Sequence, residues 1–140
     1  MIVLDTNVVS ELMRKEPDRN VLAWVDQCPA DLVFLTAITV AELLYGIARL
    51  PEGARRDLLT TKTRELFGGE FSGRILAFTG SAAVDYAKIV AARERRGRPI
   101  GMADAQIAAI CLLHGAELLT RNVKDFADTD VRVFNPWQAT

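Results

Sequence analysis

The sequence is poor in the residues that build disulfide frameworks and zinc sites. Its two cysteines, Cys28 and Cys111, stand far apart and form no C-x-x-C pair, so a disulfide framework is not expected and a reducing cytosol fits best. The single histidine, His114, has no partner ligands, which disfavours zinc. Its place directly before Gly115 predicts an ordinary role in the last turn of a helix.

Long apolar runs and a strong charge of either sign are missing as well. The first residues hold a three-residue apolar run before Asp5 and no basic segment, which argues against a signal peptide or a membrane span. The formal net charge is −1, so no whole-molecule basic field attracts nucleic acid, and any such contact needs a local patch. We therefore expect a cytoplasmic protein whose composition does not identify its partners.

The chain does have the composition of an ordinary globular domain. Of its 140 residues, 50% are hydrophobic and 25% are charged, which excludes the disordered, collagen-like and low-complexity classes. Pro17, Pro51 and the pair Gly68-Gly69 punctuate the chain, but no segment is long or polar enough to be a linker. We expect one domain over residues 1–140, built around one core.

Short apolar runs alternate with stretches of helical period. The runs predict five buried strands, at residues 2–4, 33–35, 75–78, 118–119 and 131–134. The periodic stretches predict six helices, at residues 8–14, 21–28, 40–50, 54–67, 82–96 and 104–114. This alternation indicates an α/β fold, in which right-handed βαβ units form a five-stranded, mostly parallel sheet covered on both faces.

Four acidic residues fall where such a sheet gathers its ligands, beyond the carboxyl ends of the strands. Asp5 directly follows the first strand, and Asp125 follows the strand that ends near Thr120. Glu42 lies in the first turn of the helix after the second strand, and Asp104 opens the last predicted helix. We therefore expect all four carboxylates at the same edge of the sheet.

Each acid also has a purely structural interpretation. Asp5 with Thr6 and Asn7 could be an N-cap, and Thr39 with Glu42 matches the S/T-x-x-E capping box, while the other two acids could complement a helix start or shape a turn. Taken together, however, the acids repel: two carboxylates about 4 Å apart at an effective dielectric near 20 oppose each other by roughly 4 kcal/mol. Such a cluster requires a cation, and an oxygen-only site suits Mg²⁺, with Mn²⁺ as a substitute.

Several short strings around these acids occur in a fixed order. They are Asp5-Thr6-Asn7, then Ala41-Glu42-Leu43 with Gly46, then Asp104 to Ala109, then Thr120-Arg121-Asn122, and finally Asp125-Phe126. In their order and spacing the chain resembles the PIN-domain ribonucleases, and among them the VapC and FitB-like toxins of bacterial toxin–antitoxin pairs. Asn135-Pro136-Trp137 is similar to the end of the FitB-like group, with core packing as the alternative for Trp137.

This resemblance implies a three-layer α/β/α domain that forms a homodimer and acts as an Mg²⁺-dependent endoribonuclease. It implies single-stranded or structured RNA as substrate and a cognate antitoxin that blocks the site, with DNA contacted only through that antitoxin. The chain keeps all four acidic positions of the family, Asp5, Glu42, Asp104 and Asp125, which we take as the catalytic residues.

Phosphodiester hydrolysis needs an activated water, a stabiliser for charge on the phosphate and help for the leaving oxygen, and a metal held by carboxylates supplies all three. We expect Asp5 and Asp104 to be direct ligands, and Glu42 either a ligand or the group that orients and deprotonates the water. Asp125 would give outer support. Four short polar side chains are expected to orient the carboxylates or the phosphate, with local turn bonding as the alternative: Thr6, Asn7, Thr120 and Asn122.

Basic and apolar side chains offer surfaces for partners. The run Arg93, Arg95, Arg96 and Arg98 precedes Asp104 and could bind backbone phosphates, although a solvated helix end is the simpler interpretation. Further basic residues lie near the other acids in sequence: Arg14, Lys15, Arg121 and Lys124. Two apolar stripes should mainly serve the core and in part an interface: Leu43, Leu44, Ile47 and Leu50, then Leu58, Leu59, Leu66 and Phe67.

Two other functions are compatible with an α/β chain of this kind. A phosphoacceptor receiver domain also gathers carboxylates at the strand ends, but it would want an acidic pair after the first strand, where Asp5 stands alone. A noncatalytic RNA-binding relative would keep the fold and lose ligands, whereas all four acids are present here.

Overall fold

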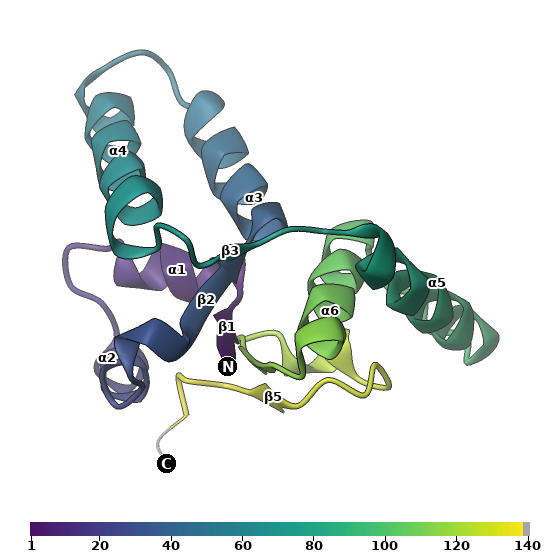
Figure 1. Ribbon diagram of the computed structural model, residues 1–140. Coiled ribbons are helices and arrows are strands. Elements are labelled where there is room, and N and C mark those ends of the chain that lie inside the picture. Colours follow the sequence, from purple (N-terminus) through teal and green to yellow (C-terminus); the bar gives the residue numbers. More distant parts are fainter. Residues whose placement is uncertain (139–140) are drawn as a thin grey trace.

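The computed structural model describes residues 1–138 and contains a five-stranded parallel sheet in the order β3-β2-β1-β4-β5 (Figure 1). β1 pairs with both β2 and β4, which places the first strand at the centre of the sheet. The prediction of five parallel strands is confirmed, although β3 and β5 are each shorter than the predicted run. Their bounds are β1 (Ile2–Leu4), β2 (Val33–Thr36), β3 (Ile75–Leu76), β4 (Glu117–Leu119) and β5 (Val133–Phe134).

Six α-helices lie between these strands in the described part of the chain. Local signals set their ends: the Asp18 carboxylate accepts hydrogen bonds from Asn20 N and Val21 N at the start of α2, and Gly115 ends α6 with φ 61°. The helices are α1 (Thr6–Leu12), α2 (Arg19–Asp26), α3 (Ala37–Ala48), α4 (Ala54–Glu65), α5 (Gly80–Arg95) and α6 (Met102–His114). Shorter helical turns are η1 (Ala30–Leu32), η2 (Leu66–Glu70) and η3 (Val123–Phe126); η1 and η3 were not predicted, and η2 begins within the helix predicted at residues 54–67.

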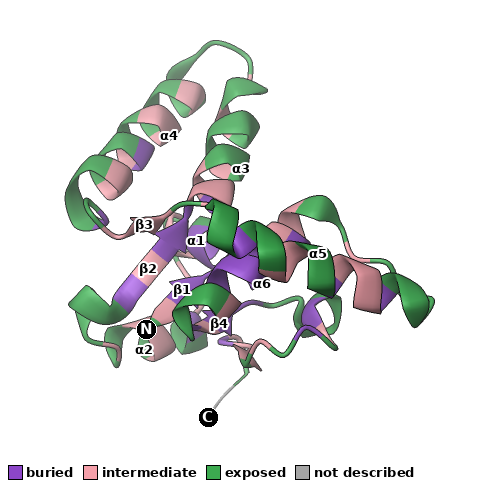
Figure 2. Ribbon diagram, turned by 45° about the vertical axis from the view of Figure 1, so that its right-hand side comes forward, coloured by how far each residue is buried: buried purple, intermediate pink, exposed green. Residues whose placement is uncertain are grey.

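Strand side chains alternate between two hydrophobic cores, one on each face of the sheet. Val3 and Leu118 pack with α5 and α6 on one face, while Leu4 and Leu119 pack with α1 and α2 on the other. The expected three-layer α/β/α arrangement is therefore confirmed. Figure 2 shows β1 and β2 largely buried between the two helical layers.

α3 and α4 pack against each other and project from the body as an arm (Figure 1). The sequence assigned their apolar stripes mainly to the core, and this is only partly right. Leu43, Leu66 and Phe67 reach the core beside α1 and α2, but Leu44 and Leu58 are 48% and 56% exposed. In an arm of two helices, each helix can bury only the side that packs against the other, so apolar side chains on the other sides are exposed to solvent.

The thiols behave as the composition suggests. Cys28 and Cys111 are both free, and burial together with the negative charge of Asp5 raises the pKa of Cys111 to about 12, which makes it unreactive. Among the helices of residues 1–138, none combines the length and apolar character that crossing a membrane requires.

Candidate functional site

The four predicted acids lie on four separate segments around the carboxyl ends of the strands. Asp5 directly follows β1, Asp104 lies in the first turn of α6, and Asp125 lies in η3 after β4. Glu42 departs from the prediction: it lies in the second turn of α3, because this helix begins at Ala37.

The capping-box interpretation of Thr39 and Glu42 is wrong. Thr36, the last residue of β2, is the N-cap of α3: its backbone is extended at φ −105° and ψ 156°, and its hydroxyl accepts a hydrogen bond from Thr39 N at 3.2 Å. Thr39 is helical and buried. The Glu42 carboxylate is therefore not used for capping and is available to the site.

Asp5 is a buried carboxylate, 4% exposed, held by donors from two strand ends. Its Oδ1 accepts a hydrogen bond from Thr6 N at 2.8 Å, which caps α1, and its Oδ2 accepts one from Thr120 Oγ1 at 2.7 Å. Burial raises the pKa of Asp5 more than these hydrogen bonds lower it, and the negative charge of Glu42 raises it further. The residue is thus both a helix cap and a member of the acidic site.

Asn7 connects the end of β1 to the end of β4. Its Nδ2 donates to Asp5 Oδ2 at 3.3 Å and to Thr120 Oγ1 at 3.2 Å, and its Oδ1 accepts from Arg121 N at 3.1 Å. The Thr120 hydroxyl also accepts a hydrogen bond from Asn122 N at 3.0 Å. This network fixes the position of Asp5, whereas Asn122 takes part in it through its backbone alone.

Thr6 links Asp5 to Glu42. Its Oγ1 lies 2.7 Å from Glu42 Oε1 and 3.1 Å from Thr39 Oγ1. A hydroxyl has one proton, and a carboxylate only accepts, so Thr6 donates to Glu42 and accepts from Thr39. The Oε1 atom of Glu42 is thereby held, and its Oε2 atom is left for another partner.

The charges of the four segments meet at Asp104. Burial is the largest cause that raises the pKa of Asp104 to about 6, and the negative charges of Asp5, Asp125 and Glu42 each raise it further, while Arg93 lowers it. The three other acids therefore all act on this carboxylate. A bound divalent cation would remove that repulsion.

The donor set at this edge suits a hard cation. Its ligating atoms would be carboxylate oxygens, which Mg²⁺ and Mn²⁺ prefer, with no histidine or thiolate. Across residues 1–138 no three acidic, histidine or cysteine side chains stand close enough together to hold an ion as they are placed. Hydrogen bonds with Thr120 and Thr6 fix one oxygen of Asp5 and one of Glu42. Asp104 is half-buried and Asp125 is exposed, so both can turn toward an ion. The residues present thus fit a Mg²⁺ site that forms when the ion binds.

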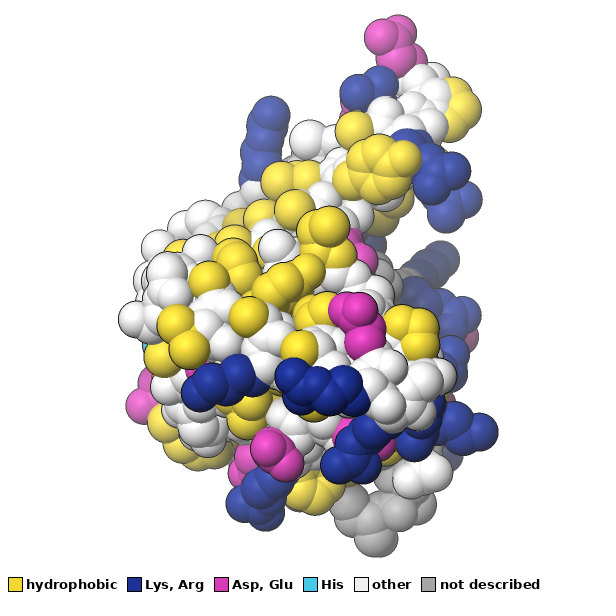
Figure 3. All heavy atoms as spheres, turned by 90° about the vertical axis from the view of Figure 1, so that its right-hand side faces the viewer, with side chains coloured by type: hydrophobic (Ala, Val, Ile, Leu, Met, Phe, Trp, Pro, Cys, Tyr) yellow, Lys and Arg dark blue, Asp and Glu magenta, His cyan; other side chains and the backbone are white. Residues whose placement is uncertain are grey.

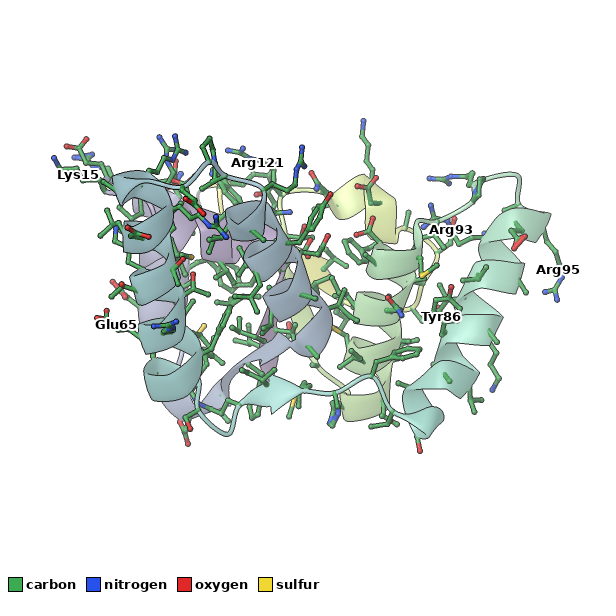
Figure 4. The ribbon with its side chains drawn as sticks, turned by 90° about the horizontal axis from the view of Figure 1, so that it is seen from above. Lys15, Glu65, Tyr86, Arg93, Arg95 and Arg121 are labelled. Atoms are coloured by element: carbon green, nitrogen blue, oxygen red, sulfur yellow. The ribbon has the colours of Figure 1, made fainter. Side chains whose placement is uncertain are left out.

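Arg93 has a role that the sequence did not reveal, and the interpretation of it as a phosphate-binding or solvated arginine is wrong. Arg93 is 5% exposed, and its Nε donates to Arg98 O at 2.7 Å. Its Nη1 donates to Asp125 O and Ala127 O, both at 2.9 Å. The guanidinium therefore holds the backbone of the segment that carries Asp125. Figure 4 shows Arg93 on the inner side of α5, whereas Arg95 points outward.

The other basic side chains divide into paired and unpaired groups. Arg96 and Arg98 pair with Asp128 at 3.2 Å and 3.4 Å, and Arg14 pairs with Glu11 at 3.2 Å. Within residues 1–138, Arg121 and Lys124 form no ion pair and line a cavity that also includes Asp125. Unpaired positive charge therefore lies beside the carboxylates, in addition to the exposed Arg95 at the end of α5.

Comparison with known proteins identifies close relatives over nearly the whole chain. The PIN domain family matches residues 2–132. The VapC ribonuclease Y4jK of Sinorhizobium fredii is 42% identical over 138 residues, covering 99% of each chain, and Toxin FitB of Neisseria gonorrhoeae is 42% identical, covering 98% of this chain and 99% of FitB. The crystal structure of FitAcB from Neisseria gonorrhoeae matches with a TM-score of 0.92 and 41% identity, covering 99% of each chain.

Proposed function

The chain belongs to the PIN-domain family, and on that premise we propose that it is a Mg²⁺-dependent endoribonuclease that acts as the toxin of a toxin–antitoxin pair. One observation carries the proposal. The negative charges of Asp5, Glu42 and Asp125, from three distant segments, all raise the pKa of Asp104. The four carboxylates are therefore close enough to repel one another at the edge of the sheet. Such a cluster disfavours the apo state and favours a divalent cation.

We assign Asp5 and Asp104 as direct ligands of the metal. Glu42 is a further ligand or the group that orients the attacking water, and Asp125 supports the site from outside the ligand shell. A Mg²⁺ ion bound there would stabilise charge on the phosphate and lower the pKa of the attacking water. Thr120 and Asn7 fix Asp5, as their hydrogen bonds to Oδ2 indicate.

Glu42 is suited to orient the attacking water. Thr6 holds its Oε1 atom at 2.7 Å, which leaves Oε2 to accept a hydrogen bond from the water and then its proton. Arg93 holds the backbone of Asp125 and so keeps that acid beside the other three.

The arm offers a surface for the antitoxin. A cavity of about 660 Å³ between α1, α3 and α4 is lined mainly by apolar side chains, including Leu43, Ile47 and Leu59, and extends to Glu42. Arg14, Lys15 and Arg55 border it, and Figure 3 shows apolar side chains along the arm with basic ones beside them. An amphipathic segment with acidic flanks would fit this groove and block the carboxylates. We also infer a homodimer and a cytoplasmic location.

RNA cleavage by the purified protein tests the proposal. We expect cleavage of a mixed single-stranded RNA in Mg²⁺, none in EDTA, and a loss of at least about a hundredfold in Asp5→Asn and Asp104→Asn. Asp57→Asn is the matched control, because Asp57 is also a first-turn helix acid but lies on α4. Cleavage that persists in EDTA or in Asp5→Asn would refute the proposal. Labelling of the protein by acetyl phosphate would instead identify a receiver domain.

A further inference from the structure

A second, polar cavity lies on the other side of the carboxylates from the arm. Its volume is about 440 Å³, within the range of small-ligand pockets. Its lining includes Arg121, Asn122, Lys124, Asp125, Asn135 and Gln138. Asp125 belongs to the acidic cluster, and the other polar lining residues offer two cations and three amides, with Val123 as an apolar neighbour.

The wall of this cavity is joined to the acidic site by hydrogen bonds. Arg121 N donates to Asn7 Oδ1 at 3.1 Å, and Asn122 N donates to Thr120 Oγ1 at 3.0 Å. Asn7 and Thr120 in turn both donate to Asp5 Oδ2. Two hydrogen bonds thus separate the cavity wall from the buried carboxylate along each route, and Asp125 itself lines the cavity, so a ligand in it would lie beside the cluster.

Arg121 is positioned by an aromatic ring and not by an acid. Its guanidinium lies 4.1 Å from the centroid of the Trp137 ring, a cation–π stack. Trp137 is itself anchored: its N donates to Asn135 Oδ1 at 2.9 Å, and its O accepts from Asn20 Nδ2 at 2.8 Å. Stacking occupies the face of a guanidinium and leaves its N–H donors at the edge, available to an anion.

Arg121 and Lys124 differ from several other basic residues of the described structure in that no acidic side chain pairs with them. Arg132 also lies over an aromatic ring, that of Phe134, but it pairs with Glu117 at 3.7 Å. Arg121 and Lys124 have no such pairing within residues 1–138. An ordered cation with no acidic partner, beside a site that handles a phosphodiester, is suited to a phosphate.

We propose that this cavity binds one nucleotide of the RNA strand next to the phosphate that is cut, an inference that rests on the proposed nuclease function. Arg121 and Lys124 bind the phosphate of that nucleotide. The amides of Asn122 and Gln138 both donate and accept, so they can contact the edge of a base, and Val123, 40% exposed, offers an apolar contact to its face. The cavity therefore contributes to the choice of cleavage site.

Binding of short RNA without metal tests this directly. Trp24→Phe leaves Trp137 as the sole tryptophan, and its fluorescence reports on the cavity. We titrate this protein in EDTA with the four homotrinucleotides of A, C, G and U and expect a saturable change with at least one. In Arg121→Met we expect the affinity to fall about tenfold, and the slope of log K against log salt to decrease by about 0.7. Lys124→Met should likewise lower the affinity for the trinucleotide and decrease the salt slope.

Arg132→Met is the matched control, because Arg132 also stacks on an aromatic ring but precedes β5 at the opposite edge of the sheet. It should bind the trinucleotides as well as Trp24→Phe alone. No saturable change with any trinucleotide, or an equal loss in Arg132→Met, would overturn the proposal. Equal binding of tri-glutamate would assign the cavity to an acidic protein segment and overturn it as well.

The test separates this proposal from the nuclease assignment. Trinucleotide binding in EDTA does not require cleavage, so a protein that binds but never cuts would refute the nuclease function alone. A protein that cuts RNA with unchanged KM and unchanged cleavage sites in Arg121→Met, folded as judged by its Tm, would refute the nucleotide pocket alone. We expect instead that KM rises and the distribution of cleavage sites changes, with kcat within about twofold.

Discussion

Replacing Asp104 with asparagine should make the metal-free protein more stable while removing its response to Mg²⁺. The folded chain binds a proton at Asp104 more tightly than the unfolded chain does, because the pKa rises from 3.8 to about 6. Between about pH 4 and pH 6 the folded state therefore holds more protons, and stability falls as the pH rises through this window. Asp104→Asn removes the ionisation that causes this loss.

The magnitude follows from the same pKa. Taken in full, the rise from 3.8 to about 6 corresponds to about 3 kcal/mol at neutral pH. Asp104 is half-buried, so solvent screening reduces this. The loss of a carboxylate from the first turn of α6 costs a further 0.5 kcal/mol or so. We expect a net gain of about 1 kcal/mol, or about 3 °C in Tm.

Thermal unfolding in EDTA and in Mg²⁺ at pH 7.5 measures both effects. In EDTA, Asp104→Asn should melt about 3 °C above the natural sequence, whereas the control Asp57→Asn should melt slightly lower, since it loses a favourable first-turn charge without relieving a cluster. Mg²⁺ should raise the Tm of the natural sequence and of Asp57→Asn, but not of Asp104→Asn. A lower Tm for Asp104→Asn in EDTA, or an equal Mg²⁺ response in all three proteins, would refute the reasoning.

Three further predictions concern the residues around the site. Arg93→Met should cost about 2–4 kcal/mol in urea unfolding, because it removes a buried guanidinium that donates to three backbone carbonyls; a cost below 1 kcal/mol would contradict this. Thr120→Val should raise the pKa of Asp5 further and weaken Mg²⁺ binding in calorimetry by about tenfold, and unchanged binding would show that the Thr120 hydroxyl does not hold a ligand. Leu58→Glu should leave the Tm within about 2 °C, because Leu58 is 56% exposed, yet abolish capture of the antitoxin in a pull-down; intact capture would place the antitoxin elsewhere.

The sheet could be predicted from the sequence because each strand is buried on both faces. Such strands appear as short unbroken apolar runs, such as Ile2 to Leu4, and their alternation with helical segments restricts the topology to parallel βαβ units. The same rule brings Asp5 and Asp125 to one edge. Helix starts were harder to predict: two threonines, Thr36 and Thr39, each suit an N-cap, and no local pattern indicates that β2 ends at Thr36.

Arg93 could have been identified from helical periodicity. It follows Ile89 by four residues, and Ile89 and Ala82 are both buried positions of α5, so Arg93 continues the buried face of the helix. Its place in a run of arginines suggested a solvated end instead. The stack of Arg121 on Trp137 had no local signal, because it joins residues that are distant in sequence and depends on how the segment after β5 crosses the sheet. Contacts of this kind require tertiary structure.

The central claim is that four carboxylates from distant segments hold one divalent site. Anomalous diffraction from crystals grown with Mn²⁺ tests it most directly, since Mn²⁺ prefers the same oxygen ligands as Mg²⁺. We expect a peak about 2.1 Å from carboxylate oxygens of Asp5 and Asp104, with Glu42 turned toward it and no peak in Asp104→Asn. Mn²⁺ bound elsewhere, or a peak that persists in Asp104→Asn, would contradict the account.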